Sequence, residues 1–357
     1  MRNLIVESKG LLTMAYLIMP IILILSIKKK NYKENILSKS DSQSLKAISA
    51  IFIVLHHLSQ RVGINLITLP FIEIGKYSVA LFLFLSGYGV MSSYINNKNY
   101  LDVFLRKRIL TIYTPFIISN IIFIIIYSIK GKKFSLLEVI EYTLGINLID
   151  GVMWFIFSII IFYIIFYIAF KFTTIKRGTI NLIIGTIGYL VLGILFDLGT
   201  TITNISFAFA GGSIVAIYKE KFFELLQKKY VQKNILLICI LIITRIISIL
   251  CENIFLREVI LSISTLSYAV LLVSLSKRFE LNGKIVKLLG GISFEIYLLH
   301  NKLITIIPNI NKSIVIAISY FLILIIFSYI FNKMNSKINK HLVNKPIKSE
   351  LKTDSNI

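Results

Sequence analysis

The stretch MWFIFSIIIFYIIFYIAF, residues 153–170, decides the fold class, because it carries no charged side chain over nearly the length of a membrane-crossing helix, about 20 residues. The whole chain follows the same pattern. Of its 357 residues, 56% are hydrophobic and 16% are charged, and the mean hydropathy is +0.83. An average soluble domain carries about 25% charged residues. The composition excludes a disordered, fibrous or disulfide-rich secreted chain and predicts an all-α, polytopic membrane protein.

Apolar runs of similar length predict about eleven membrane spans, an extra N-terminal helix at 10–27 followed by a ten-helix core. The core spans are expected at 46–62, 74–95, 109–129, 152–171, 179–196, 203–218, 235–251, 257–276, 288–306 and 313–332. The chain then divides into residues 1–43, with the extra helix and a basic cytoplasmic linker, and residues 44–333, the core. Residues 334–357 form a polar cytoplasmic tail that is expected to be disordered.

The charge balance indicates how the chain is oriented. Lys and Arg number 39 against 17 Asp and Glu, giving a net charge of +22. In a soluble chain this excess would suggest nucleic acid, but basic residues also gather in the cytoplasmic loops of membrane proteins. Most of them fall on one side if the N-terminus is outside and the C-terminus is cytoplasmic. We therefore expect that orientation in a plasma membrane, with lipid as the surroundings and no nucleic acid partner. The longest external connection, residues 130–151, is expected to form an interfacial helix or a re-entrant turn.

Histidines interrupt two of the apolar spans. Of the four in the chain, His56, His57 and His300 lie inside spans. A single intramembrane His is more often a packing residue than a functional one, but ionisable groups at such depth mark candidate sites. Lys46 and His57 are eleven residues apart on one helix, so they share nearly one face with a rise of about 16 Å between them.

The span at 288–306 predicts a second polar stripe. Ser293, Tyr297 and His300 follow one another at i, i+4 and i+7, which places them on one face of a helix. His300 is expected at a depth similar to that of His57, so the two imidazoles can share one buried polar cavity. Glu295 points elsewhere on the same helix, and pairing with a basic residue such as Lys46 or Arg108 would offset the cost of its burial.

Pairs of small residues have two interpretations. Ser86–Gly87 and Gly211–Gly212 can be sites where helices approach closely, which is the commoner use. In a cavity the same glycines would let an extended ligand arm pass.

Several segments together resemble the membrane acyltransferase-3 superfamily. They are K-x10-H at 46–57, LFLFLSGYGV at 81–90, RKR…IYTPF at 106–116, MWFIFSIIIFY at 153–163 and GISFEIYLLH at 291–300. Each motif alone is weak, but they occur in the family's order and approximate spacing. The resemblance covers about residues 44–332 and implies a ten-helix core.

The resemblance implies an acyltransferase of the bacterial plasma membrane that moves an acetyl or succinyl group from cytoplasmic acyl-CoA to a hydroxyl of an extracytoplasmic glycan. The acceptor would be a surface polysaccharide or cell-wall glycan, with polysaccharide-synthesis proteins as partners and no metal. The family carries an Arg-x10-His motif, and its His corresponds to His57, which the resemblance implies is a general base or a transient acyl acceptor. Lys46 stands where the family has Arg, and Lys lacks the bidentate fork of the guanidinium. The chain departs from the family's Arg-x-x-Arg pattern, because the residue three positions after Arg108 is Thr111.

The remaining site residues follow from the same resemblance. Lys46, Arg106, Lys107 and Arg108 would bind the phosphates of acyl-CoA, although a basic cluster is more often an ordinary cytoplasmic anchor. His300, Tyr297 and Ser293 would orient His57 or stabilise the developing oxyanion, with Glu295 nearby.

Two other functions remain open from the sequence. A transporter or flippase would use the same polar cavity without covalent chemistry, although no inverted repeat is evident. An inactive or structural partner in a polysaccharide-synthesis complex is the third reading, favoured by the departures at Lys46 and Thr111.

Overall fold

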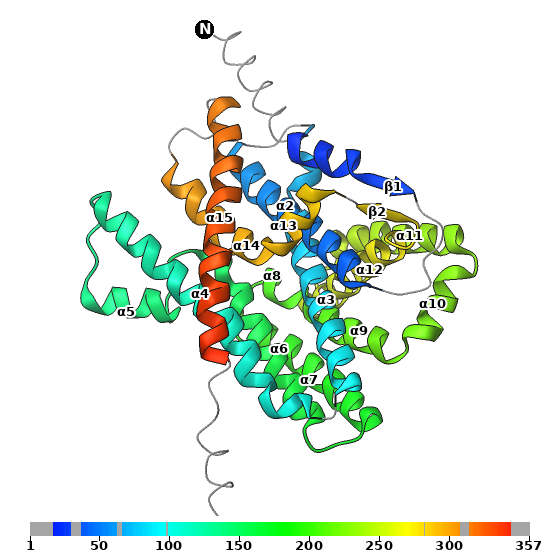
Figure 1. The fold of residues 1–357 in the computed structure, drawn as a ribbon. Helices are drawn as coiled ribbons and strands as arrows, with labels where there is room; N and C mark the ends of the chain where they lie inside the picture. The colour runs from blue at the N-terminus through cyan, green and yellow to red at the C-terminus, as the bar shows by residue number, and fades with distance from the viewer. Residues whose placement is uncertain are drawn as a thin grey trace, which may run out of the picture.

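The computed structural model of the protein describes residues 17–29, 37–62, 66–97, 99–281, 283–307 and 314–343, and these are almost wholly helical (Figure 1). Residues 17–25 form the first helical segment. The longer helices are α2 (Lys39–Val62), α3 (Ile74–Asn96), α4 (Tyr100–Ile129), α6 (Trp154–Phe170), α7 (Ile175–Leu195), α9 (Ser206–Ile217), α11 (Tyr230–Leu250), α12 (Ile254–Leu275), α14 (Ser293–Ile306) and α15 (Ile314–Val343). The shorter elements are β1 (Ile27–Lys29), η1 (Leu69–Phe71), α5 (Leu136–Leu144), η2 (Gly151–Met153), α8 (Thr200–Thr203), α10 (Lys219–Gln227), β2 (Phe279–Leu281) and α13 (Lys284–Gly291).

Eight helical segments in the described ranges are long and apolar enough to cross a membrane. They correspond to eight of the predicted core spans, so the protein is a multi-pass helical membrane protein. The predicted span 46–62 lies within α2, and the predicted span 288–306 is divided at Ile292 into α13 and α14. The predicted span 10–27 extends outside the described residues. These three spans stay predictions.

The helices α2 and α14 lie inside the bundle. Val54, Leu55 and Leu58 of α2 and Leu298 and Leu299 of α14 are all buried. The two helices contact each other, and α2 also contacts α3 and α13. A helix surrounded by other helices does not need an apolar face toward lipid, which explains why these two carry more polar residues than the outer helices.

Glycines bring α3 and α9 into backbone contact. A Cβ atom on Gly87 would overlap the carbonyl oxygen of Phe209, and one on Gly212 would overlap the carbonyl oxygen of Phe84. Only glycine permits an approach this close. Of the two interpretations of the small-residue pairs, close packing therefore holds at Gly87 and Gly212. A Cβ atom on Gly89, two residues further along α3 and therefore on another side of the helix, would meet open space.

Two features depart from the sequence-based expectations. Strand β1 pairs antiparallel with β2, with Lys28 opposite Glu280, in a two-stranded ribbon that no motif predicted. The expectation of a disordered tail after Met334 is wrong up to Val343, because α15 continues through that segment. Asn335 is buried there, and the guanidinium of Arg106 donates to the carbonyl oxygen of Leu342 at 3.1 Å, which ties the end of the helix to α4.

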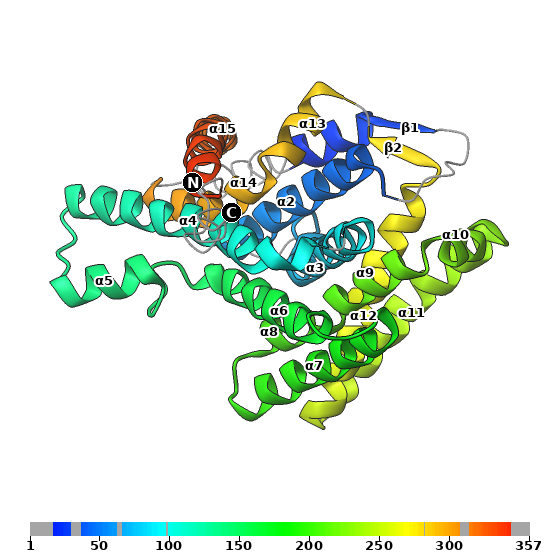
Figure 2. The same ribbon diagram turned by 60° about the horizontal axis from the view of Figure 1, so that its bottom comes forward.

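The connection at 130–151 contains a short helix, α5, which lies beside the far end of α4 and projects from the bundle (Figure 2). Its N-terminus is closed by a capping box, in which the Ser135 hydroxyl accepts from the Glu138 backbone and the Glu138 carboxylate accepts from the Ser135 backbone. These hydrogen bonds from Ser135 hold the pKa of Glu138 below its ordinary value. Exposed Leu136, Leu137 and Ile140 give α5 an apolar surface suited to a membrane interface.

Candidate functional site

The structure brings together two histidines from separate inner helices. His57 of α2 and His300 of α14 have ring centroids 5.1 Å apart, with an angle of 35° between the ring planes. His300 is completely buried, whereas His57 is half-buried. The contact between α2 and α14 thus places a more accessible imidazole beside a deeply buried one.

The hydrogen bond of His300 fixes where its proton lies. Its Nδ1 is 2.7 Å from the carbonyl oxygen of Tyr297, and a carbonyl oxygen only accepts. Nδ1 of the neutral ring must therefore donate, which leaves the lone pair on Nε2. That Nε2 atom is buried and has no hydrogen-bond partner within the described part of the chain. A buried unpaired acceptor is costly, and its position next to His57 is a mark of function.

A polar cavity of about 250 Å³ lies between α2, α3, α4, α6 and α14. Its polar lining comprises Ser42, Lys46, Ser86, Arg108, Tyr163, Ser293 and Tyr297. We call it the central cavity. Lys46 and Arg108 face it from α2 and α4, and neither forms an ion pair with a carboxylate among the described residues. Two unneutralised cations on one cavity can hold an anionic group such as a phosphate.

Arg108 is held in place by aromatic residues. Its Nε and Nη2 donate to the Tyr100 hydroxyl at 3.2 and 2.8 Å, and its guanidinium lies 6.0 Å from the ring centroid of Tyr163. The Tyr163 hydroxyl is 2.8 Å from the Ser86 hydroxyl, and either one can donate. Whichever does, the other keeps a hydroxyl proton for a ligand in the central cavity.

Ser293 and Tyr297 line the cavity with hydroxyls that already donate to the backbone. The Ser293 hydroxyl donates to the carbonyl oxygen of Gly290 at 3.0 Å, and the Tyr297 hydroxyl donates to that of Val152 at 2.6 Å. The Tyr297 ring centroid is 6.0 Å from that of His300. Tyr297 therefore lines the central cavity and also lies beside His300.

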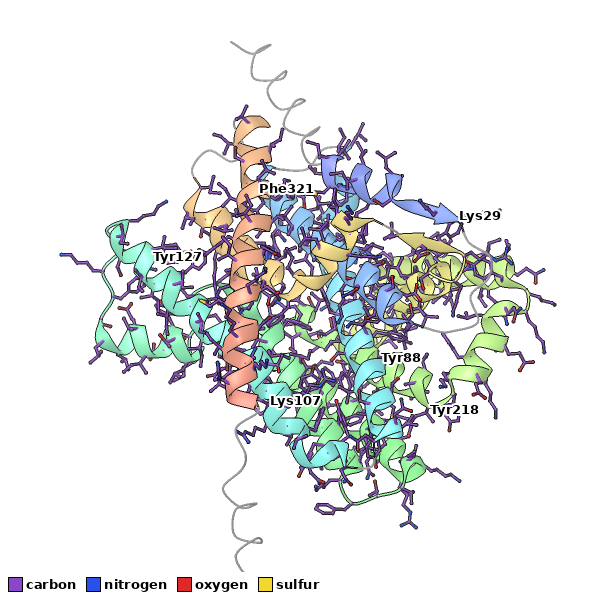
Figure 3. All side chains as sticks on the ribbon, in the orientation of Figure 1. Lys29, Tyr88, Lys107, Tyr127, Tyr218 and Phe321 are labelled. Atoms are coloured by element: carbon purple, nitrogen blue, oxygen red, sulfur yellow. The ribbon has the colours of Figure 1, made fainter. Side chains whose placement is uncertain are left out.

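Five of the nine predicted site residues lie outside the lining of the central cavity. His57 and His300 form the pair described above, and the other three lie elsewhere. The expected ion pair of Glu295 with Lys46 or Arg108 does not form, because its carboxylate accepts from the Asn332 amide of α15 at 2.9 Å. Arg106 binds the end of α15, as described above. Lys107 is exposed at the same end of α15 (Figure 3). Successive residues point about 100° apart on a helix, so only Arg108 of this trio reaches the cavity.

The structure adds residues that the sequence did not single out. Lys302 is completely buried, and its ammonium donates to Ser119 and Asn120 of α4 at 2.8 Å each. The Asp150 carboxylate accepts from the amide of Asn301 at 2.7 Å. Both contacts fasten α14 to its neighbours. A charge inside the apolar stretch NKLITII was a usable sign for Lys302, but its partners required the fold.

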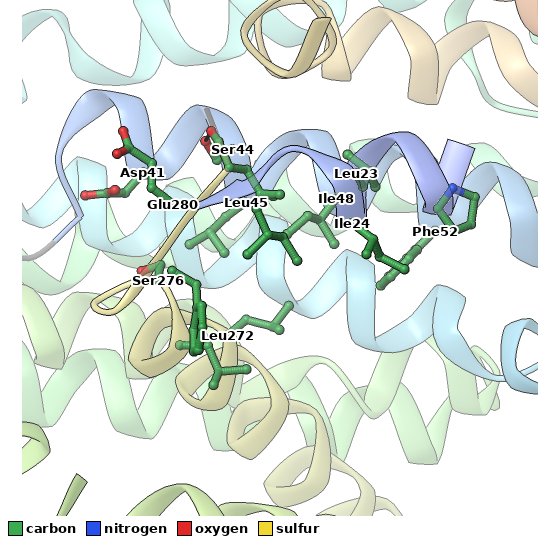
Figure 4. Close-up of a pocket in the computed structure, with 15 residues that line it drawn as sticks. Leu23, Ile24, Asp41, Ser44, Leu45, Ile48, Phe52, Leu272, Ser276 and Glu280 are labelled. Carbon is green, nitrogen blue, oxygen red and sulfur yellow. Dashed lines mark hydrogen bonds between the residues drawn. The ribbon is translucent and has the colours of Figure 1, made fainter. Parts of the chain in front are cut away.

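A second, larger cavity of about 410 Å³ lies between residues 17–27, α2, α12 and β2 (Figure 4). Leu23, Ile24, Leu45 and Leu272 typify its apolar wall, with polar residues at one end. It contains none of the candidate site residues. No set of three or more His, Cys, Asp or Glu side chains in the described ranges is placed to hold a metal ion.

Comparison with known proteins gives one match. The sequence model of a family described as "Acyltransferase domain", the membrane acyltransferase-3 family, matches residues 41–333. This range contains α2 from its third residue on, all of α14 and every residue of the central cavity. No curated protein and no solved protein structure matches the chain.

Proposed function

Since the chain belongs to the membrane acyltransferase-3 family, and is therefore a membrane acyltransferase, we propose that it moves an acetyl or succinyl group from cytoplasmic acyl-CoA to a hydroxyl of an extracytoplasmic cell-surface glycan. The acceptor in this proposal is a surface polysaccharide or cell-wall glycan, made by polysaccharide-synthesis proteins in a bacterial plasma membrane. The N-terminus is outside and the C-terminus is cytoplasmic, as the distribution of basic residues favours.

The central cavity supports the donor side of this proposal. Lys46 and Arg108 supply two cations without carboxylate partners, which suits the phosphates of CoA. Gly89 also lines the cavity, and its open surroundings leave room for the pantetheine arm. Lys46 and His57 are separated by about 16 Å along α2, so a donor anchored by its phosphates reaches His57 with an extended arm.

The single observation that carries the chemistry is the contact between His57 and His300. His57 acts as general base: its Nε2 takes the proton of the acceptor hydroxyl while the hydroxyl oxygen attacks the thioester carbonyl. The carbon–sulfur bond then breaks, the acyl group stays on the acceptor oxygen, and the CoA thiolate takes the proton back from His57. His300, whose ring lies beside that of His57 and whose buried Nε2 has no hydrogen-bond partner among the described residues, orients the His57 ring in this proposal.

The test uses membranes that contain the protein and labelled acetyl-CoA or succinyl-CoA. Wild-type protein transfers label to glycan, and His57→Ala abolishes the transfer while membrane insertion stays intact. His341→Ala is the matched control, because His341 is exposed near the end of α15 and distant in sequence from both site helices. Retained transfer by His57→Ala contradicts the role of His57. Substrate flux without any label transfer would instead support a transporter.

A further inference from the structure

A chain of three hydrogen bonds leads from His57 to the backbone. The Nδ1 atom of His57 is 3.1 Å from Oε1 of Gln60, one turn further along α2. Nε2 of Gln60 is 3.2 Å from Nε2 of His56. Nδ1 of His56 is in turn 3.1 Å from the carbonyl oxygen of Phe71, in η1. His56 and His57 thus connect to each other through one amide side chain.

Only one proton arrangement satisfies all three hydrogen bonds with neutral rings. The Phe71 carbonyl only accepts, so Nδ1 of His56 donates and its Nε2 carries a lone pair. That lone pair accepts from the amide nitrogen of Gln60. The amide oxygen then faces His57, whose Nδ1 donates to it. The lone pair of His57 is therefore on Nε2, which is the atom that the proposed function uses as the base.

We infer that Gln60 and His56 are positioning residues that set the tautomer of His57, an inference that rests on the proposed role of His57 as general base. A neutral imidazole in water prefers to carry its proton on Nε2, the opposite of what catalysis needs here. The fixed carbonyl of Phe71 reverses this preference through His56 and Gln60. The Gln60 amide donates through its nitrogen and accepts through its oxygen. The proton position on His56 therefore determines which end of the amide faces His57, and so which nitrogen of His57 carries the proton.

The packing around His56 holds its ring in the position that these hydrogen bonds require. A Cβ atom on Gly75, at the start of α3, would overlap the His56 ring. The ring therefore lies directly against the α3 backbone. The His56 and His57 ring centroids are 4.7 Å apart with an interplanar angle of 65°, so the two rings meet edge to face. His56 has little freedom to turn away from either hydrogen-bond partner.

Two substitutions at His56 separate this role from a role in packing. His56→Gln loses the ring but keeps one donor and one acceptor in a short side chain. His56→Phe keeps the ring shape but loses both. We expect His56→Gln to retain kcat within about threefold. We expect His56→Phe, like Gln60→Met, to lower kcat by at least about tenfold with KM for acyl-CoA unchanged, up to the roughly 10⁴-fold that general-base catalysis contributes. A lower kcat for His56→Gln than for His56→Phe would overturn the inference.

Nitrogen-15 NMR of histidine-labelled protein measures the tautomer without using activity. In detergent-solubilised wild-type protein, His57 should show a protonated Nδ1, and in folded Gln60→Met the proton should move to Nε2. An unchanged His57 spectrum in Gln60→Met would overturn the inference, even if activity falls. A changed spectrum with full activity would leave the tautomer assignment standing and contradict the proposed role of His57. The two failures are thereby distinguished, and size-exclusion profiles identify the folded fraction in each case.

Discussion

Replacing Lys46 by Met tests whether the two cations of the central cavity bind the phosphates of the donor. The variant removes the charge but keeps a long, unbranched side chain, so packing along α2 is preserved. A hydrogen bond to a charged group contributes about 1.5–3 kcal/mol, and each 1.4 kcal/mol corresponds to a factor of ten in affinity. Lys46→Met should therefore raise KM for acyl-CoA roughly 10- to 150-fold and leave kcat at saturating donor nearly unchanged.

The assay compares acyl-CoA with an S-acyl pantetheine that lacks the phosphates. With the truncated donor, wild type and Lys46→Met should have the same KM, because the contact that distinguishes them is absent. Lys46→Arg restores the charge and adds a bidentate fork, so its KM for acyl-CoA should be at or below that of wild type. Lys221→Met, on the exposed surface of α10, makes the same charge change outside the site. If Lys46→Met raises KM by the same factor with both donors, phosphate binding at Lys46 is refuted.

Three further outcomes are expected. Arg108→Met should raise KM for acyl-CoA by a factor similar to that of Lys46→Met, while Lys107→Met, an exposed substitution, should change it less than about twofold in the same kinetic assay. Gly212→Val should lower the melting temperature in detergent because it forces α3 and α9 apart, whereas Gly89→Ala, which meets open space, should leave it unchanged. Ser135→Ala should speed amide exchange across α5 by removing the capping box. Lowering the pH should reduce the protection factor of the α5 amides, which is their exchange rate corrected for the intrinsic pH dependence of exchange. A carboxyl whose pKa is lowered by folding stabilises α5 above its unfolded pKa and loses that effect as the pH falls through the folded one.

Much of the fold is readable from the sequence because a bilayer imposes a length and a composition on each span. Eight of the predicted spans show this directly, because the structure has a long apolar helix at each. The spans of the inner helices α2 and α14 were also predicted from apolar length, and their histidines marked them as a candidate site. Helical spacing alone placed Lys46 with His57, and Ser293 with Tyr297 and His300. Such spacing holds within one helix, so these placements needed no knowledge of neighbours.

Helical spacing could not predict the contacts between side chains of different helices. Three consecutive basic residues point in three directions, and only the packing of α4 against α3, α6 and α14 decides that Arg108 is the one at the cavity. Glu295 was expected to find a cation, but the neighbouring α15 offers it Asn332. Gln60 carried a usable sign, since it lies three and four residues after the adjacent histidines, within hydrogen-bond reach on a helix.

Because Lys46 and His57 lie on one uninterrupted helix, α2 fixes the distance between them. Neither end of the measured interval can shift relative to the other without breaking the helix. Each residue inserted between them would lengthen the interval by about 1.5 Å and rotate His57 by about 100° away from the helix face that it shares with Lys46. In the proposed function, α2 would select a donor by the length between its phosphates and its thioester. It would set no limit on the size of the acyl group beyond the thioester.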